Sequence, residues 1–397
     1  MSARAAVDGL DHLEGNAAAG ATVDEVRGSF HTWLAAHADD LARFRTLPAG
    51  LDDQMALLAD LQRLLFDGGW LRLGWPPELG GLGGSPVLRG VVSEELAAAG
   101  YPPPFSFGMM EVLGPAVARF ARADVAASVL PPLLRGEEFW CQGFSEPDAG
   151  SDLGSLRLRA EPVEGGFVAN GQKVWTSWAQ FADRCVLLGR TGTPSDGHRG
   201  ITAFLVDMAT PGVTVRELRA MNGDSEFAEL FFDDVFIPAE RTLGDVGGGW
   251  AVTMHVLSCE RGAVAWQRGA WMLRRLEDLV AHLGPSAAHH RARIGQLYAH
   301  LYSLRLLSRR TLVQLAADGR AGPSSSVDKV VMAAAEQSLF DAVLDLDAAQ
   351  LLTDDSPTAR TWRSEYFYSR AASIYGGTSE IQRNIIAEHL VGLPRSR

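Results

Sequence analysis

The sequence has 397 residues, of which 47% are hydrophobic and 21% charged, and its formal net charge is −12. This composition is typical of a globular chain with more than one packed unit, and the acidic balance argues against nucleic acid as the main partner. No stretch approaches the roughly 18 uninterrupted apolar residues of a membrane span, and the first twenty residues lack the apolar core of a secretory signal. We therefore expect a cytoplasmic protein without a membrane span.

Metal binding is not expected. The cysteines are widely separated, at Cys141, Cys185 and Cys259, and the ten histidines show no ligand spacing. Neither a zinc pattern nor a disulfide framework is present.

The first third of the chain is predicted to be helical. Thr22 and Glu25 have the spacing of a capping box. The residues that follow recur on one helical face: Val26, Phe30, Trp33, Leu34 and Leu41. Further helices are expected over residues 52–69 and 87–100, the second ending at a glycine before "YPPP".

The middle of the chain is predicted to be a β-unit. Asn170 and Gly171 lie between two extended runs and predict a type I′ hairpin. Short strands are expected over residues 184–191, 200–208, 213–218 and 228–238, several of them with alternating polarity.

The helical period returns after Gly247. A stripe at helical spacing comprises Ile294, Leu297, Leu301 and Leu304. Another helix is expected over residues 327–346, and a last one after Gly377. The fold class is thus α+β in separate blocks, which we divide into an N-terminal helical domain (1–138), a middle β-domain (139–240) and a C-terminal helical bundle (241–397).

Two segments of the middle block have side chains that suit a cofactor. In "WCQGFSEPDAGSDLGS", hydroxyls and backbone amides around Ser145 and Ser151 can cradle a phosphate or a polar ring edge. In "VWTSW", Trp175 offers a flat apolar face beside the hydroxyls of Thr176 and Ser177. Taken alone, each segment is more typical of a satisfied surface loop or a buried strand tryptophan.

Two C-terminal segments offer chemistry as well. In "SIYGGTSEIQRNIIAEHL", two glycines allow a tight bend before a helix in which Ser379 and Gln382 have capping-box spacing. In "LSCERGAVAWQRGA", Glu260 and Arg261 stand at the start of a mostly apolar helix. A carboxylate with few polar neighbours can act as a base, although an exposed ion pair is the commoner arrangement.

Five segments together, in this order, resemble the acyl-CoA dehydrogenase family from about Trp70 to the C-terminus: "CQGFSEPDAGSDL", "NGQKVWTS", "FFDDVFIPAERTLG", "ERG" and "IYGGTSEIQRNIIAEHLVGLPR". The resemblance implies FAD, an acyl-CoA substrate and electron-transfer flavoprotein as the acceptor of electrons. A base removes the pro-R α-proton while a hydride moves from the β-carbon to flavin N5, which gives a trans-2-enoyl thioester.

The resemblance also assigns residues. It places Gln142, Phe144, Ser145, Gly150 and Ser151 against the flavin or the thioester, Trp175, Thr176 and Ser177 on the isoalloxazine, Thr378 and Glu380 on the adenosine half of FAD, and Arg261 in the substrate site. Many members of the family have the catalytic Glu directly after the Tyr, where this chain has Gly376. A minority carry it on the "ER" helix, so Glu260 is the predicted base. The N–H of Gly376 would then bind the thioester carbonyl.

Two departures from the family pattern affect FAD contacts made by a neighbouring subunit. The segment "LVAHLGPSAAHHRARI" is shorter than usual, and "QLLTDDSPTARTW" lacks the usual glycines. The pattern resembles the branch that degrades steroid side chains or other bulky acyl groups. We expect an oligomer, either of one chain or an α2β2 assembly with a related subunit. The alternatives are a non-catalytic partner subunit and a flavin oxidase or monooxygenase on the same fold. Glu260 favours the dehydrogenase and argues against the oxidase, whereas the lost FAD contacts leave room for the partner subunit.

Overall fold

The computed structural model describes residues 20–48, 50–104, 107–319 and 321–394. Residues 1–19, in which we expected no secretory signal, lie outside this range. Within it, no helix is both long and apolar enough to cross a membrane.

Seven helices of the described range precede the sheet: α2 (Val23–Ala36), α3 (Ala38–Leu41), α4 (Leu51–Asp67), α5 (Pro86–Ala98), α6 (Phe107–Val112), α7 (Gly114–Phe120) and α8 (Ala123–Arg135). The predicted capping box is confirmed: Thr22 Oγ1 accepts from the N–H of Glu25 (3.3 Å), and the Glu25 carboxylate accepts from the N–H of Thr22 (2.8 Å). The predicted apolar face is buried at Val26, Phe30 and Trp33.

The middle block is a mixed sheet of eight strands: β1 (Trp140–Gly143), β2 (Arg159–Val163), β3 (Gly166–Ser177), β4 (Arg184–Arg190), β5 (Ile201–Asp207), β6 (Val213–Leu218), β7 (Phe227–Pro238) and β8 (Thr242–Leu243). Their order is β6-β7-β3-β2-β4-β5-β8, and β1 pairs with β4 in parallel. The four strands expected after the hairpin are all present.

The predicted hairpin at Asn170 and Gly171 is wrong. Strand β3 continues through both residues, and a shift in its register with β7 falls at this point. The side chain of Asn170 donates to Asp234 Oδ1 (3.0 Å) and accepts from the N–H of Asp234 (2.9 Å). Asn170 therefore bridges two strands, and the tight turn between β2 and β3 lies instead at Glu164 and Gly165, where Gly165 has a φ of +78°.

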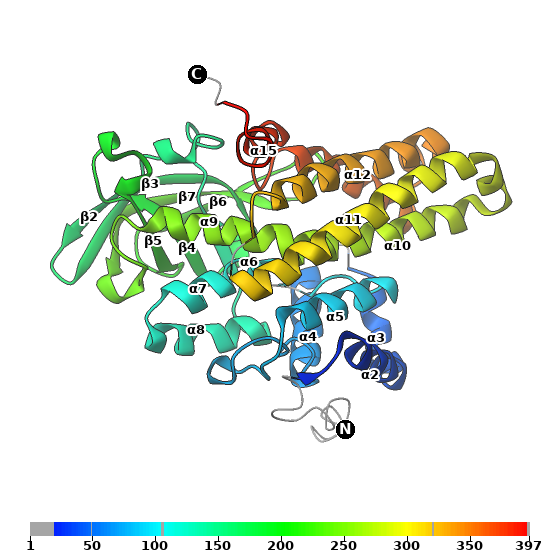
Figure 1. The fold of residues 1–397 in the computed structure, drawn as a ribbon, viewed down its shortest axis with the longest axis horizontal. Helices are drawn as coiled ribbons and strands as arrows, with labels where there is room; N and C mark the ends of the chain where they lie inside the picture. The colour runs from blue at the N-terminus through cyan, green and yellow to red at the C-terminus, as the bar shows by residue number, and fades with distance from the viewer. Residues whose placement is uncertain (1–19, 49, 105–106, 320, 395–397) are drawn as a thin grey trace.

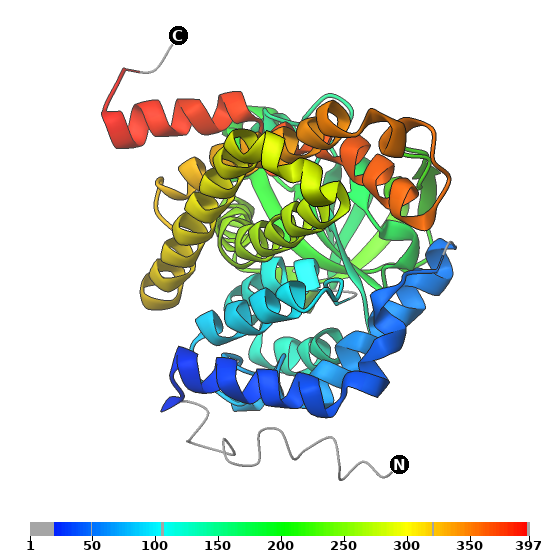
Figure 2. The same ribbon diagram turned by 90° about the vertical axis from the view of Figure 1, so that its right-hand side faces the viewer.

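The C-terminal block contains α9 (Gly249–Cys259), a π-helical turn (Glu260–Val264), α10 (Ala265–Leu283), α11 (Arg291–Asp318), α12 (Ser325–Leu346), α13 (Ala348–Leu352), α14 (Pro357–Ser369) and α15 (Ser379–Ile386). Helices α10, α11 and α12 pack side by side (Figures 1 and 2). Leu297, Leu301 and Leu304 are buried as predicted. The expected helix start at Glu260 and Arg261 is wrong, because the helix runs on through both residues as a π-turn.

The three blocks share one hydrophobic core, which fixes α9 in place. Buried residues of the N-terminal helices pack with Val186 and Ile201 of the sheet and with Val252 and Val256 of α9. Helix α9 lies beside β5 (Figure 1). The predicted α+β class, helical domain, β-domain and helical domain in this order, is confirmed.

Candidate functional site

The loop after β1 and the end of β3 lie together. The N–H of Val174 donates to the carbonyl of Ser145 (2.9 Å), and Lys173 Nζ donates to the carbonyl of Phe144 (3.1 Å). Two segments predicted to hold a cofactor, residues 142–151 and 175–177, are therefore neighbours. Within the loop Gln142 and Ser145 are half-buried and Phe144 is buried, whereas Gly150 and Ser151 are exposed.

A buried ion pair that we did not predict anchors this loop. Glu146 Oε1 lies 2.8 Å from Lys173 Nζ, and the same carboxylate accepts from the N–H groups of Arg157 (2.6 Å) and Leu158 (2.9 Å). Burial lowers the pKa of Lys173 to about 8. Because the pair is enclosed and each charge is hydrogen-bonded, it holds the loop rigidly against the sheet.

Trp175 and Thr176 have the properties of a surface shaped for a planar group. The Trp175 side chain is 64% exposed, and its φ of +60° is unusual for a bulky residue. Thr176 is fully buried, yet its Oγ1 has no hydrogen-bond partner in the described chain. Ser177, next along, is half-buried. The strained backbone and the exposed ring of Trp175 fit a flavin, whose flat face would meet the ring, whereas the orphaned Thr176 hydroxyl is enclosed beneath the surface.

Glu260 and Gly376 share one space. A Cβ built on Gly376 would lie 2.3 Å from Glu260 Oε1 and 3.1 Å from its carboxyl carbon, well inside van der Waals contact. The Glu260 carboxylate therefore lies directly against the backbone of Gly376, and fills the position where a side chain at residue 376 would begin. Glu260 opens the π-turn, a distortion often found at functional sites.

The glycine turn is fixed by one side chain. Gly376 and Gly377 have φ values of +63° and +89°, which favour glycine. Gln382 Nε2 donates to the carbonyl of Gly376 (3.1 Å). The expected capping pair of Ser379 and Gln382 is therefore wrong: the N-cap is Thr378, whose hydroxyl accepts from the N–H of Ile381 (3.2 Å).

Glu380, predicted to contact FAD, and Arg261, predicted to contact the substrate, lie in different environments. Glu380 is exposed and lies 3.6 Å from Arg383. Arg261 is half-buried, its Nε has no hydrogen-bond partner in the described chain, and burial lowers its pKa. Asp328 of α12 is buried, and desolvation raises its pKa to about 6. The negative charges of Glu260 and Asp328 oppose this lowering of the Arg261 pKa.

The site thus has two halves. Among the residues that the structure describes, no hydrogen bond joins the loop and β3 residues to Glu260, Arg261 or the 376–380 segment. The sheet and the helices are linked instead by Asn222, which donates to Ser364 Oγ (3.2 Å), and by Glu226. Burial raises the pKa of Glu226 to about 7, and the positive charge of Arg268 on α10 opposes this rise.

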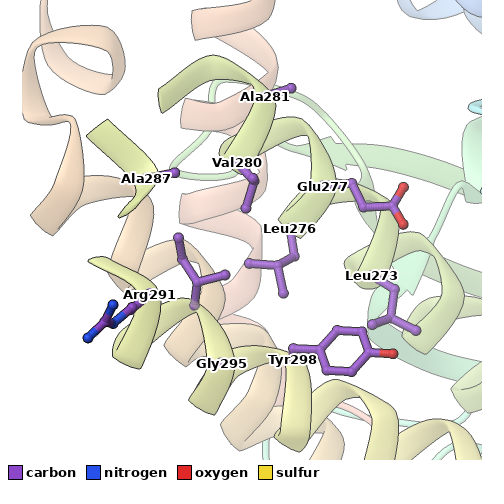
Figure 3. A pocket seen from close by; sticks show the side chains of 10 residues that line it. Leu273, Leu276, Glu277, Val280, Ala281, Ala287, Arg291, Gly295 and Tyr298 are labelled. Atoms are coloured by element: carbon purple, nitrogen blue, oxygen red, sulfur yellow. The ribbon is translucent and has the colours of Figure 1, made fainter. Parts of the chain in front are cut away.

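A large cavity lies away from the predicted site residues. A cavity of about 630 Å³ between α10 and α11 is lined by Leu276, Val280 and Tyr298 among others, and none of the predicted site residues lines it (Figure 3). Within the described ranges no group of three or more His, Cys, Asp or Glu side chains could hold a metal ion.

Comparison with protein families matches all three blocks. The N-terminal, middle and C-terminal domains of acyl-CoA dehydrogenase match residues 22–137, 141–235 and 247–391. Acyl-CoA dehydrogenase IpdE1 of Mycolicibacterium smegmatis is 34% identical over 390 residues, which cover 94% of this chain and 98% of the relative. The chain belongs to the acyl-CoA dehydrogenase family. It is an oxidoreductase of that family, whose members generally bind FAD.

Other relatives include acyl-CoA dehydrogenase FadE34 of Mycobacterium tuberculosis, 36% identical over 90% of this chain and 49% of the relative. Among solved structures, the Tcur3481-Tcur3483 steroid ACAD superposes with a TM-score of 0.79 at 27% identity, covering 94% of this chain and 97% of that one. The ChsE4-ChsE5 complex of M. tuberculosis has a TM-score of 0.75 at 26% identity, with 94% and 98% covered.

Proposed function

We propose that this acyl-CoA dehydrogenase converts an acyl-CoA thioester to the trans-2-enoyl thioester, with Glu260 taking the α-proton. The observation that carries the proposal is the contact between the Glu260 carboxylate and Gly376. A carboxylate at this point can reach the same α-carbon as a base attached to residue 376.

Gly376 supports the second part of the chemistry. Its N–H has no hydrogen-bond partner in the described chain. By donating a hydrogen bond to the thioester carbonyl, this N–H would make the α-proton more acidic. The hydrogen bond strengthens as the enolate forms. Gln382 holds the next peptide group, through the carbonyl of Gly376, and so limits the movement of the turn that carries this donor.

FAD would be held by both halves of the site. Trp175 would stack on the ring system, and Ser177 would donate to its polar edge, while the enclosed Thr176 hydroxyl would have to be uncovered to do the same. Ser145, Gly150 and Ser151 would contact the flavin or the thioester, together with Gln142 and Phe144. Thr378 and Glu380 would contact the adenosine half, and Arg261 the substrate. Bound FAD would supply the acceptor for the hydride that leaves the β-carbon.

The acyl group is proposed to be bulky and ring-bearing. The support is the similarity to the structure titled a steroid ACAD, at 27% identity over most of both chains. We propose electron-transfer flavoprotein as the acceptor of the electrons and a cytoplasmic location.

A second subunit, a copy or a related chain, is proposed to cover α11. Helix α11 exposes Tyr298, Tyr302, Leu306 and Val313, large apolar side chains that a monomer would leave in water. The two-component titles of the solved relatives favour a related chain.

The test is Glu260→Gln, with Glu277→Gln on α10 as the matched control. We expect Glu260→Gln to keep its flavin and its affinity for substrate, and to lose about 10²–10⁴-fold in kcat, the usual contribution of a general base. The exposed Glu277 should tolerate the change. Flavin reduction is followed with CoA thioesters of straight-chain, branched and steroid carboxylic acids. Undiminished turnover in Glu260→Gln with every thioester would refute the assignment.

A further inference from the structure

We propose that Lys329 is a positioning residue for the dehydrogenation, which holds the 372–376 turn and, through it, the Glu260 carboxylate in the reactive place. The proposal depends on the proposed role of Glu260. Lys329 lies on α12 between Asp328 and an apolar run that begins at Val330, and no role was predicted for it from the sequence.

The Lys329 side chain is enclosed and attached to the turn at two points. It is 4% exposed. Its Nζ donates to the carbonyl of Ala372 (2.6 Å) and lies 3.8 Å from the centre of the Tyr375 ring. A hydrogen bond and a cation–π contact with the same turn join α12 to the segment that leads into Gly376.

The ammonium and the catalytic carboxylate thereby lie against adjacent residues. Lys329 contacts Tyr375, and Glu260 contacts Gly376. The negative charge of Glu260 acts on Lys329, so the two side chains attract each other across the turn. Burying a lone ammonium is costly, and these contacts with Tyr375, Ala372 and Glu260 offset the cost. They also specify where the carboxylate and the Gly376 N–H lie relative to each other.

The charge on Lys329 is set by the groups around it. Glu260 and Arg261 act on it from the π-turn, and Glu336 acts from its own helix, where it is paired with Arg268 of α10 (2.7 Å). The phenol of Tyr375 stays neutral, because burial raises its pKa well above the usual value.

Burial lowers the pKa of Lys329 to about 8. Below pH 8 the ammonium is charged and holds both partners. Above pH 8 it is neutral, the cation–π contact and the attraction to Glu260 are lost, and the turn loosens.

Lys329→Met tests the proposal, with Gln337→Leu as the control. Gln337, two turns along α12, ties the same region without a charge, through Ser369 O (3.3 Å) and Ser373 Oγ (3.2 Å). The kcat and KM for the CoA thioester of a steroid carboxylic acid are measured from about pH 6 to 9.5 in the flavin-loaded enzyme. The wild type should show a fall in kcat near pH 8.

In Lys329→Met, kcat should be about 10- to 100-fold lower, as expected for a base misplaced by up to about 1 Å, with KM changed less than about twofold and no fall near pH 8. Gln337→Leu can lower the melting temperature but should keep the fall near pH 8. If Lys329→Met does not fold, Lys329→Arg replaces it. Its guanidinium stays charged, so its kcat should no longer fall near pH 8.

The outcomes separate the two proposals. Full turnover in Glu260→Gln overturns the proposed function. The role of Lys329 is refuted if Glu260→Gln is inactive while Lys329→Met keeps its kcat. It is also refuted if the kcat of the wild type does not fall near pH 8. In both cases Glu260 remains the base.

Discussion

Gly376→Ala perturbs the contact on which the proposed chemistry depends. The added methyl would lie 2.3 Å from Glu260 Oε1, whereas ordinary contact begins near 3.4 Å, so the oxygen must retreat by about 1 Å. A displacement of about 1 Å at a reacting group can cost on the order of 10²-fold in rate, or about 2.7 kcal/mol of transition-state stabilisation.

The same substitution also strains the backbone. Alanine at a φ of +63° costs about 1–2 kcal/mol of folding stability relative to glycine. Gly392→Ala is the matched control, because φ is +76° there and its methyl would meet no atom within 4 Å. Both variants should lose similar stability in urea unfolding.

The assay compares kcat of the two flavin-loaded variants with the same acyl-CoA. Gly376→Ala should lose about 10²-fold, and Gly392→Ala much less. Equal kcat in wild type and Gly376→Ala would show that the carboxylate against Gly376 is not the reacting base.

Two further predictions concern the other half of the site and the junction between the halves. Trp175→Gly should relieve the strained φ of +60°, so the flavin-free protein should be as stable as the wild type or up to about 1 kcal/mol more stable. The flavin absorbance per chain should fall. Unchanged flavin content would contradict stacking on Trp175. The pKa of Glu226 is about 7 in the folded protein, against an ordinary 4.5. Its contribution to the unfolding free energy is therefore complete below pH 4.5 and is lost as the pH rises through 7. Glu226→Gln should raise the unfolding free energy at pH 8 by up to about 3 kcal/mol and have little effect at pH 5. An equal change in unfolding free energy at pH 5 and pH 8 would show that burial does not oppose ionisation of the Glu226 carboxylate.

The errors of the sequence interpretation have a common cause. Asn170 and Gly171 are typical of a tight turn, but the Asn170 side chain is used by Asp234 on another strand. Ser379 and Gln382 have capping-box spacing, but Gln382 turns back to the carbonyl of Gly376, and Thr378 takes the cap. In both cases a contact from outside the local segment outweighed a local preference.

Some site residues had a signal in the sequence that was not used. Lys329 directly precedes the apolar run "VVMAAA", and Lys173 lies in a strand next to Val174, where both side chains are buried. A charge at a position that periodicity predicts to be buried must have a partner. The partners themselves, Glu146 and the 372–376 turn, lie too far away in the chain to be found by spacing.

The sequence by itself determined the order of helical and strand blocks, because periodicity is a local property, and the family, because its motifs are short segments of residue types. It also gave Glu260 as the predicted base, which stays a prediction. Only the tertiary structure decided that Glu260 lies against Gly376, that a buried ammonium lies behind the same turn, and that the helix carrying Glu260 is continuous. These facts depend on how α9, α12 and the glycine turn pack around a shared core, and packing between distant segments is set by the whole fold and not by any one of them.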